Sequence, residues 1–195
     1  MAKASQELID AFRAFREQAI WVVHCKNINF ALFEGGEGRE AMLLSVAGAF
    51  FQDLSFFLQE HWIALCGRLT DPPESSGFAN LSSQKLLQLA QQDKVSSLEI
   101  ESLASDLLDY RKKIRLARNK LVAHNDLKTH LANAPLAGHH KADVERFVIS
   151  LNQFCDELGN AIGEGPLDFQ TQPGPGDVID FLKFLKRHNQ FQKKV

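Results

Sequence analysis

The stretch that decides the fold is SLEIESLASDLLDYRKKIRLARNKLVAH, residues 97–124. Its apolar residues recur at alternating steps of four and three positions, which places them in one stripe along an α-helix. The stripe consists of Leu103, Leu107, Tyr110, Ile114, Ala117 and Leu121. We therefore expect one long helix, from about Ser97 to His124, that turns this stripe toward the core.

The same helical periodicity recurs along most of the chain, and no stretch shows the alternation of a strand. Further helices are expected from Ser5, as N-cap, until the glycines of CKNINFALFEGGEG, residues 25–38, break the first one, and over residues 40–69, 82–92 and 177–195. Another is expected to carry Val144, Phe147, Leu151, Phe154, Leu158 and Ile162. Either Ser82 or Ser83 would cap the short one, and the two prolines of TDPPESSGFAN, residues 70–80, end the helix before it. The sequence thus predicts an all-α protein, a helical bundle with additional short helices.

The helix over residues 40–69 has the broadest apolar surface. We expect it to be central, with Phe50 and Phe57 widening its buried face. The stripe itself would contain Leu44, Ala47, Phe51, Leu54, Leu58, His61 and Leu65. Fifteen phenylalanines against one tyrosine also predict a Phe-rich core rather than a Tyr-rich binding surface.

The length of 195 residues predicts one domain. Its core bundle would span about residues 5–163, followed by the Gly- and Pro-rich linker GEGPLDFQTQPGPG, residues 163–176, and a C-terminal helix over 177–195. That basic amphipathic helix is interpreted as docked on the bundle rather than on a membrane or nucleic acid.

Charge and cysteine content limit the class of protein. A net charge of −2 gives no general attraction to nucleic acid or anionic membrane, so any such affinity must come from a local patch. Cys25, Cys66 and Cys155 are far apart, which predicts buried free thiols in a reducing compartment. The N-terminus shows no signal-peptide pattern, and we expect no apolar run to approach the ~20 residues of a membrane span. Both features predict a cytoplasmic protein.

A local basic patch is present at residues 111–120, RKKIRLARNK, of which six are Lys or Arg and none is acidic. Arg111, Arg115 and Arg118 follow at steps of four and three, so they share one side of the helix. Two interpretations stay open. The cations either complement the negative end of the helix dipole as a solvated surface, or they form a binding site.

The positions of Arg118 and His124 favour a site. On an ideal helix they flank Leu121, about 120° apart around the axis and roughly 9 Å apart along it. Side chains so placed on one helix do not readily converge on one small group. Two copies of the helix crossing near Leu121 about a two-fold axis would bring both pairs into one cleft. The alternative is that His124 is a hydrogen-bonded core histidine.

The motif RNKLVAH, residues 118–124, resembles that of the HEPN superfamily of nucleotide-binding helical domains, in which an Arg and a His are separated by four to six residues. Together with FFQDLSFFLQEHWIALCGRLTDPP, residues 50–73, it looks like the abortive-infection branch found in bacteria, and the resemblance spans about residues 10–160. It implies a HEPN-like helical bundle. Active members of the superfamily are metal-independent endoribonucleases that work as dimers, so the resemblance implies no cofactor and no metal.

The resemblance also assigns roles to particular residues. Arg118 would bind the scissile phosphate, Asn119 would orient it or the histidine, and His124 would act as the acid–base group. These roles suit the chemistry, because a guanidinium binds phosphate through paired hydrogen bonds and a histidine carries protons near neutral pH. The backbone of RNA would be held by the basic run, namely Arg111, Lys112, Lys113, Arg115 and Lys120.

Three functions therefore stay open. The first is a ribonuclease of a defence or toxin system, acting as a homodimer on RNA, with an antitoxin protein as a further partner. The second is a non-catalytic interaction module in which Arg118 and His124 hydrogen-bond across the dimer. The third is a domain that senses a small nucleotide at the same basic cleft. None of the three requires a membrane.

Other histidines are weaker candidates. His130, His139 and His140 are interpreted as loop residues rather than metal ligands, because adjacent histidines rarely point together and no Cys or carboxylate completes a tetrahedral set. His61 and its neighbour Glu60 could approach the motif helix, but a hydrogen-bonded core histidine is the preferred interpretation of His61.

Overall fold

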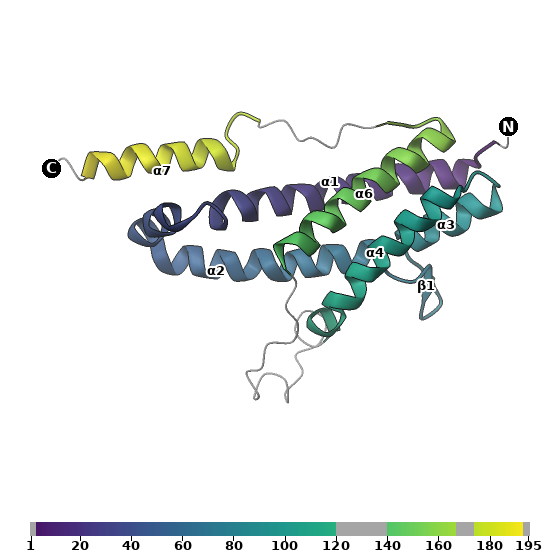
Figure 1. Cartoon of the computed structure of the whole chain (residues 1–195), viewed down its shortest axis with the longest axis horizontal. Helices are drawn as coiled ribbons and strands as arrows, with labels where there is room; N and C mark the ends of the chain where they lie inside the picture. The colour runs from purple at the N-terminus through teal and green to yellow at the C-terminus, as the bar shows by residue number, and fades with distance from the viewer. Residues whose placement is uncertain (1–2, 120–139, 167–173, 193–195) are drawn as a thin grey trace. The chain divides into compact units, whose positions relative to one another are not determined.

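The computed structural model describes residues 3–119, 140–166 and 174–192. This part of the chain is helical apart from one small hairpin (Figure 1). The helices are α1 (Gln6–Phe33), α2 (Glu37–Leu69), α3 (Ser83–Gln92), α4 (Leu98–Ala117), α6 (Lys141–Ile162) and α7 (Val178–Gln192). Strands β1 (Glu74–Ser75) and β2 (Phe78–Ala79) pair antiparallel. The prediction of an all-α protein is confirmed.

Contacts between residues divide the chain into two compact units. The first comprises Met1–Val22 and Ile63–Phe169, and the second comprises Val23–Trp62 and Gln170–Val195. Helices α1 and α2 each contribute one part to either unit. The predicted C-terminal helix corresponds to α7, and part of the predicted linker precedes it in the described residues. The single-domain interpretation stays a prediction.

Serine side chains fix the starts of three helices in the first unit. The hydroxyl of Ser82 accepts a hydrogen bond from the Lys85 N–H, and that of Ser97 accepts one from Ile100. The Ser5 hydroxyl accepts from Leu8 in the same way, so Ser5 caps α1 as expected. Such a cap satisfies an N–H that the first turn of a helix leaves without a partner, typically stabilising by about 1 kcal/mol. Gly163 ends α6 in the left-handed conformation, with φ of 81°.

The core of the first unit lies between α4 and α6, which pack along each other with α3 against α4 (Figure 1). Every described residue of the predicted α4 stripe is buried, and Leu121 lies outside the described residues. The rings of Tyr110 and Phe147 lie 4.6 Å apart between the two helices, and Phe154 meets Phe15 of α1 edge-on at 5.9 Å. From α6 the buried set is Val144, Phe147, Val148, Leu151, Phe154, Cys155 and Leu158.

The second unit has a smaller core. It contains Leu32, Leu43, Phe51, Leu182 and Leu185, from α1, α2 and α7. The backbone of α2 leaves the helical conformation at Ala47, with φ of −160° and ψ of 65°, so the residues before and after it do not share one continuous helical phase.

The predicted wide buried face of α2 is wrong. Phe50 and Phe57 are 59% and 61% exposed, and Leu44 is exposed as well. The break at Ala47 puts Leu44 out of phase with the residues that follow. After the break the core of the second unit takes up Phe51, with Leu54 and Leu58 packed against it, and leaves Phe50 and Phe57 outside. The phenylalanines therefore supply both the core and much of the exposed apolar surface.

The interpretation of His61 as a core histidine is wrong too, because its side chain is exposed. At this end of α2 the buried face is formed by Trp62, Leu65, Cys66 and Leu69. Residue 61 lies about 100° around the helix from residue 62, at the edge of that face.

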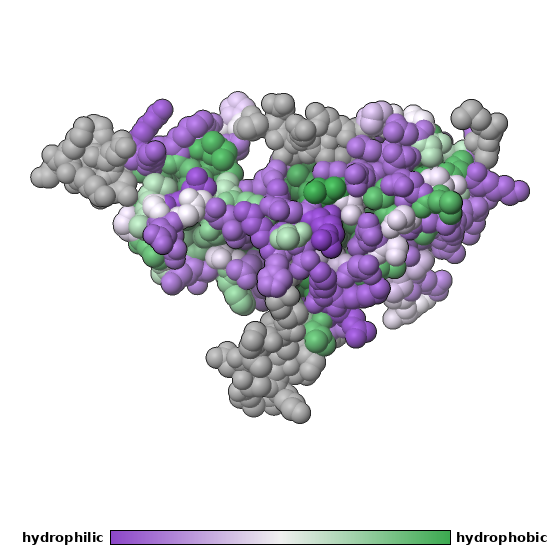
Figure 2. All heavy atoms as spheres, in the orientation of Figure 1, coloured by the Kyte–Doolittle hydropathy of each residue, from purple (hydrophilic) through white to green (hydrophobic). Residues whose placement is uncertain are grey.

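Among the described residues one helix, α2, is long and apolar enough to cross a membrane, with a mean hydropathy of 1.6 over 18 residues of which 11% are buried. This corrects the expectation that no apolar run approaches that length. Length and composition are weak grounds by themselves, since core helices of soluble proteins meet the same criterion. Figure 2 shows apolar side chains at the surface among polar ones. Those exposed on α2 are Leu44, Val46, Phe50, Phe56 and Phe57.

The α4–α6 core makes a direct prediction for stability. Replacing the fully buried Phe154 by Ala removes its contact with Phe15 and leaves a cavity, so Phe154→Ala should lower the free energy of unfolding by about 3–5 kcal/mol. Ile149, on the same helix, is 56% exposed, and Ile149→Ala should stay within about 0.5 kcal/mol of the wild type. Urea unfolding of the three proteins measures both changes. Equal losses would contradict the placement of α6.

Candidate functional site: two arginines on one aspartate

The motif arginine lies where α4 meets the end of α2. Arg111 and Arg118 are seven residues apart, which is two helical turns or about 10 Å along the axis, and they therefore share one side of α4. Asp71 follows the last turn of α2. Its carboxylate accepts hydrogen bonds from both, with Arg111 Nη1 2.7 Å from Oδ1 and Arg118 Nη2 3.1 Å from Oδ2. One carboxylate thus fixes both arginines.

The backbone of α2 contributes to the same arrangement. Arg111 Nη1 also donates to the carbonyl oxygen of Gly67 at 3.0 Å, which satisfies a carbonyl in the last turn of α2. The aliphatic stem of Arg118 lies against Gly67. A Cβ added at Gly67 would lie 3.1 Å from Arg118 Nε and 3.2 Å from its Cγ. The absence of a side chain at residue 67 therefore provides the space in which Arg118 lies.

Asn119 completes the surroundings of the guanidinium. Its Oδ1 accepts a hydrogen bond from Arg118 Nη1 at 3.3 Å, and its side chain is exposed. Arg118 directly follows the last residue of α4 and keeps a right-handed helical backbone, with φ of −56° and ψ of −49°. The role that the resemblance implies for Asn119, orienting the phosphate or the histidine, stays a prediction.

The guanidinium of Arg118 retains binding capacity. A guanidinium carries five N–H donors, and the contacts to Asp71 and Asn119 use two of them. The side chain is 30% exposed, against 20% for Arg111 and 17% for Asp71. Two cations and one carboxylate leave a net positive charge at this position. The arrangement can therefore bind an anion through Arg118 while Asp71 holds the side chain in place.

Comparison with protein families decides what the chain is. The model of the HEPN_AbiU2 family, described as AbiU2, matches residues 5–181. The chain belongs to the HEPN_AbiU2 family. The expected membership of the HEPN superfamily and of its abortive-infection branch is confirmed. No curated protein and no solved structure matches it.

In this HEPN-family chain most of the basic run is paired with carboxylates. Lys112 Nζ lies 2.6 Å from an oxygen of Asp109, and Lys113 Nζ lies 2.6 Å from Asp143 on α6. Arg115 is exposed and makes no ion pair with another described residue. The run is therefore a set of local ion pairs rather than an unbroken positive surface.

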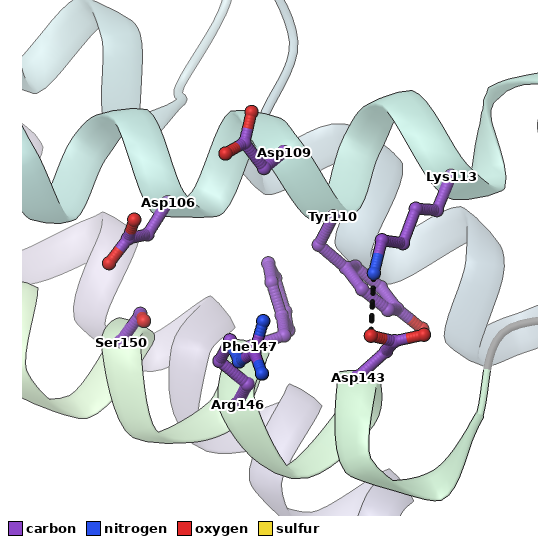
Figure 3. A pocket seen from close by; sticks show the side chains of 8 residues that line it. All are labelled: Asp106, Asp109, Tyr110, Lys113, Asp143, Arg146, Phe147 and Ser150. Atoms are coloured by element: carbon purple, nitrogen blue, oxygen red, sulfur yellow. Dashed lines mark hydrogen bonds and ion pairs between the residues drawn. The ribbon is translucent and has the colours of Figure 1, made fainter.

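The Lys113–Asp143 pair crosses a shallow polar groove between α4 and α6, which Figure 3 shows from close by. Tyr110 and Phe147 form its floor and are both buried. The exposed side chains of Asp106, Asp109 and Arg146 surround it, and Ser150 lies at one end. Because acidic and basic groups alternate here, the groove offers no surface of one sign to a phosphate backbone.

Several predicted residues lie elsewhere. His124 and Lys120 lie outside the described residues, as do His130 and His139. Glu60 and His61 belong to the second unit, whereas Arg118 belongs to the first. His140 directly precedes α6, where its backbone N–H donates to Asp143. Among the described residues no group of three or more His, Cys, Asp or Glu side chains could hold a metal ion.

The cysteines are buried free thiols, as expected. Burial raises the pKa of the Cys25 thiol to about 11, and it raises the pKa of Cys155 above its usual range. Both thiols are therefore protonated at neutral pH, which makes them poor nucleophiles.

Sequence reasoning missed Asp71 and Gly67. Both lie in the stretch quoted for the family resemblance, yet nothing in their spacing relates them to a motif about fifty positions later. A glycine in the last turn of a long apolar helix, followed shortly by an acidic residue, was the available signal.

The shared carboxylate gives a second prediction. Asp71→Ala leaves two partly buried guanidinium groups without their acceptor, so the free energy of unfolding should fall by about 1–3 kcal/mol. Asp109→Ala breaks a solvent-exposed pair on the same helix and should leave the unfolding midpoint unchanged. Chemical denaturation of both variants is the measurement. Indistinguishable midpoints would show that Asp71 does not secure the two arginines.

A third prediction concerns pH. The hydrogen bond from Lys113 and that from the His140 backbone lower the pKa of Asp143. Because the pKa is lower in the folded state, its contribution to stability is present above the unfolded pKa of about 3.9 and is lost as pH falls through the folded pKa. Asp143→Asn should therefore be less stable than the wild type near pH 7, with the two unfolding midpoints converging at low pH. The exposed Glu145→Gln serves as control, and a difference independent of pH would exclude the ion pair as the cause.

Proposed function

We propose that this HEPN-family protein is a metal-independent endoribonuclease of a bacterial defence or toxin system, and that it acts as a homodimer. The observation that carries the proposal is the partly exposed, held guanidinium of Arg118 at the end of α4, six residues before His124 in the motif. An arginine fixed by Asp71 and Asn119 binds a phosphate with little loss of side-chain freedom.

The chemistry needs only a proton carrier and a cation. The 2′-oxygen of a ribose attacks the adjacent phosphorus, a 2′-O–P bond forms and the P–O5′ bond breaks, which leaves a 2′,3′-cyclic phosphate. One imidazole takes the proton from the 2′-hydroxyl, and a protonated imidazole donates one to the departing 5′-oxygen. Arg118 stabilises the charge that develops on the phosphate oxygens.

A dimer supplies what a single chain lacks in this scheme. The 2′-hydroxyl and the 5′-oxygen lie on opposite sides of the phosphorus, so two His124 side chains, one from each copy, suit the two proton transfers. Crossing of the two motif helices near Leu121 would place two Arg118 side chains beside the same phosphate.

A second candidate is a non-catalytic interaction module of the same fold. It is favoured by the pairing of Arg118, Lys112 and Lys113 with carboxylates of their own chain, which lowers the positive charge available to RNA. In that case Arg118 and His124 would stabilise the dimer by hydrogen bonds, and His124→Ala would weaken dimerisation.

The ribonuclease proposal predicts a phenotype that depends on one side chain. Expression of the wild type in a bacterium should arrest growth and fragment total RNA, whereas His124→Ala and Arg118→Ala should do neither. Cleavage by the purified wild type should persist in excess EDTA, because no metal takes part. His130→Ala, six positions after His124 and outside the motif, is the matched control and should behave as the wild type.

The outcomes separate the two candidates. RNA that stays intact with a folded, dimeric wild type, together with a looser dimer in His124→Ala, would favour the interaction module. Cleavage that EDTA abolishes would contradict the metal-independent mechanism.

A further inference from the structure

Beside the arginine pair lies a pocket to which the proposed reaction assigns no role. It has a volume of about 260 Å³ and is bounded by α1, the last turns of α2 and the chain that leaves the hairpin. All its lining residues belong to the first unit. Asp71 is one of its walls, and the same carboxylate holds Arg118. Any group that fills this pocket therefore contacts the residue that holds the proposed phosphate-binding side chain.

The walls are apolar and the rim is polar. Leu65 and Leu69 are buried beneath the pocket, and Leu81 and Ala79 close one side. The volume is below that of pockets for drug-sized ligands, which begin at about 300 Å³, and it suits one planar ring system. Among these lining residues a nucleobase would contact aliphatic side chains, and Arg68 is the one whose planar guanidinium can stack on a base or bind its edge.

The polar groups of the rim differ in what they offer. Asp71 is an acceptor with spare lone pairs, since a carboxylate has about four acceptor positions and two are used by the arginines. Asn80 donates through Nδ2 to the carbonyl oxygen of Pro72 and to the Ser75 hydroxyl, so its amide can offer the pocket only Oδ1, a second acceptor. Arg68 is exposed, makes no ion pair with another described residue, and supplies donors.

Two acceptors and one arginine match one base better than the others. Guanine has adjacent N1–H and N2–H₂ donors on one edge and the O6 and N7 acceptors on another, where arginine commonly binds it through two hydrogen bonds. Adenine offers a single exocyclic donor group and no O6. Gln18, which has both a donor and an acceptor, suits either base.

We propose that this pocket, formed around Arg68, Asp71 and Asn80, binds a guanine base. The guanine is presented by a single-stranded RNA or by a free guanosine nucleotide. If the pocket is a subsite for the RNA substrate, the inference rests on the proposed ribonuclease function, because the pocket would place a guanine beside the phosphate held by Arg118. The binding itself does not require cleavage.

The test measures binding without chemistry. Three fluorescent hexanucleotides, UUGUUU, UUAUUU and UUIUUU (I, inosine), carry 2′-O-methyl riboses that cannot attack the phosphate, and their affinities are compared by anisotropy. The guanine probe should bind roughly tenfold more tightly than the adenine probe, since a good bidentate contact discriminates by at least that order. Inosine, which lacks only the 2-amino group, should lie between them.

Two arginine variants locate the preference. Arg68→Ala should lower the guanine-to-adenine ratio severalfold, by loss of the O6 and N7 contacts, and leave the smaller preference that the acceptors Asp71 and Asn80 supply. Arg146→Ala removes an exposed arginine from the α4–α6 groove and should keep the wild-type ratio. Both positions are exposed, so both variants should fold, which thermal melting checks.

Competition by GMP distinguishes a free guanosine nucleotide from a guanine in RNA as the ligand. A site for the free nucleotide releases the RNA probe at micromolar GMP, whereas a site for RNA keeps the probe bound.

Equal binding of the three probes, or no binding of any, would overturn the guanine site. So would a guanine preference that is undiminished in Arg68→Ala or is lost in Arg146→Ala. The ribonuclease proposal fails separately, through intact RNA in the expression experiment, and a guanine preference could coexist with that result.

Discussion

The carboxylate of Asp71 is the interaction on which the candidate site depends. It joins the end of α2 to α4 and fixes Arg111, within α4, and Arg118, directly after it, with its two oxygens. Arg111 in turn holds the carbonyl of Gly67, so the contact reaches the backbone of α2 as well. Because the same residue also lines the neighbouring pocket, the arginine of the HEPN motif, the end of α2 and the proposed guanine site share one electrostatic centre.

This arrangement changes how the basic run is understood. Its sequence reads as a positive surface, yet Lys112 and Lys113 are matched by Asp109 and Asp143, and Arg111 and Arg118 share Asp71. Pairing of this kind lowers general attraction to polyanions, in keeping with a net charge of −2 for the chain. A ligand of this protein would then be selected by local hydrogen-bonding geometry more than by charge.

Local patterns predicted most of the helical structure. The cap at Ser82, the stripe from Leu103 to Ala117 and the prolines after Asp71 act within a few residues, and each was readable from the sequence. The exposure of Phe50 and Phe57 was not, because periodicity identifies an apolar side of a helix but not whether another element covers it. The contact of Asp71 with Arg118 spans 47 positions and depends on how two helices cross. Arg118 was found through its helical spacing and its motif, whereas His124 and Lys120 lie outside the described residues.

The close approach of Arg118 to Gly67 has a consequence for how such a protein can evolve. The two positions lie on different helices but compete for one volume, so neither is free to drift alone. A lineage that replaces Gly67 by a larger residue must move the stem of Arg118, and with it the guanidinium. A lineage that has already lost the arginine can accept a larger residue at position 67. Covariation between these two positions would thus separate, within the family, the chains that still need the arginine in place from those that have abandoned it.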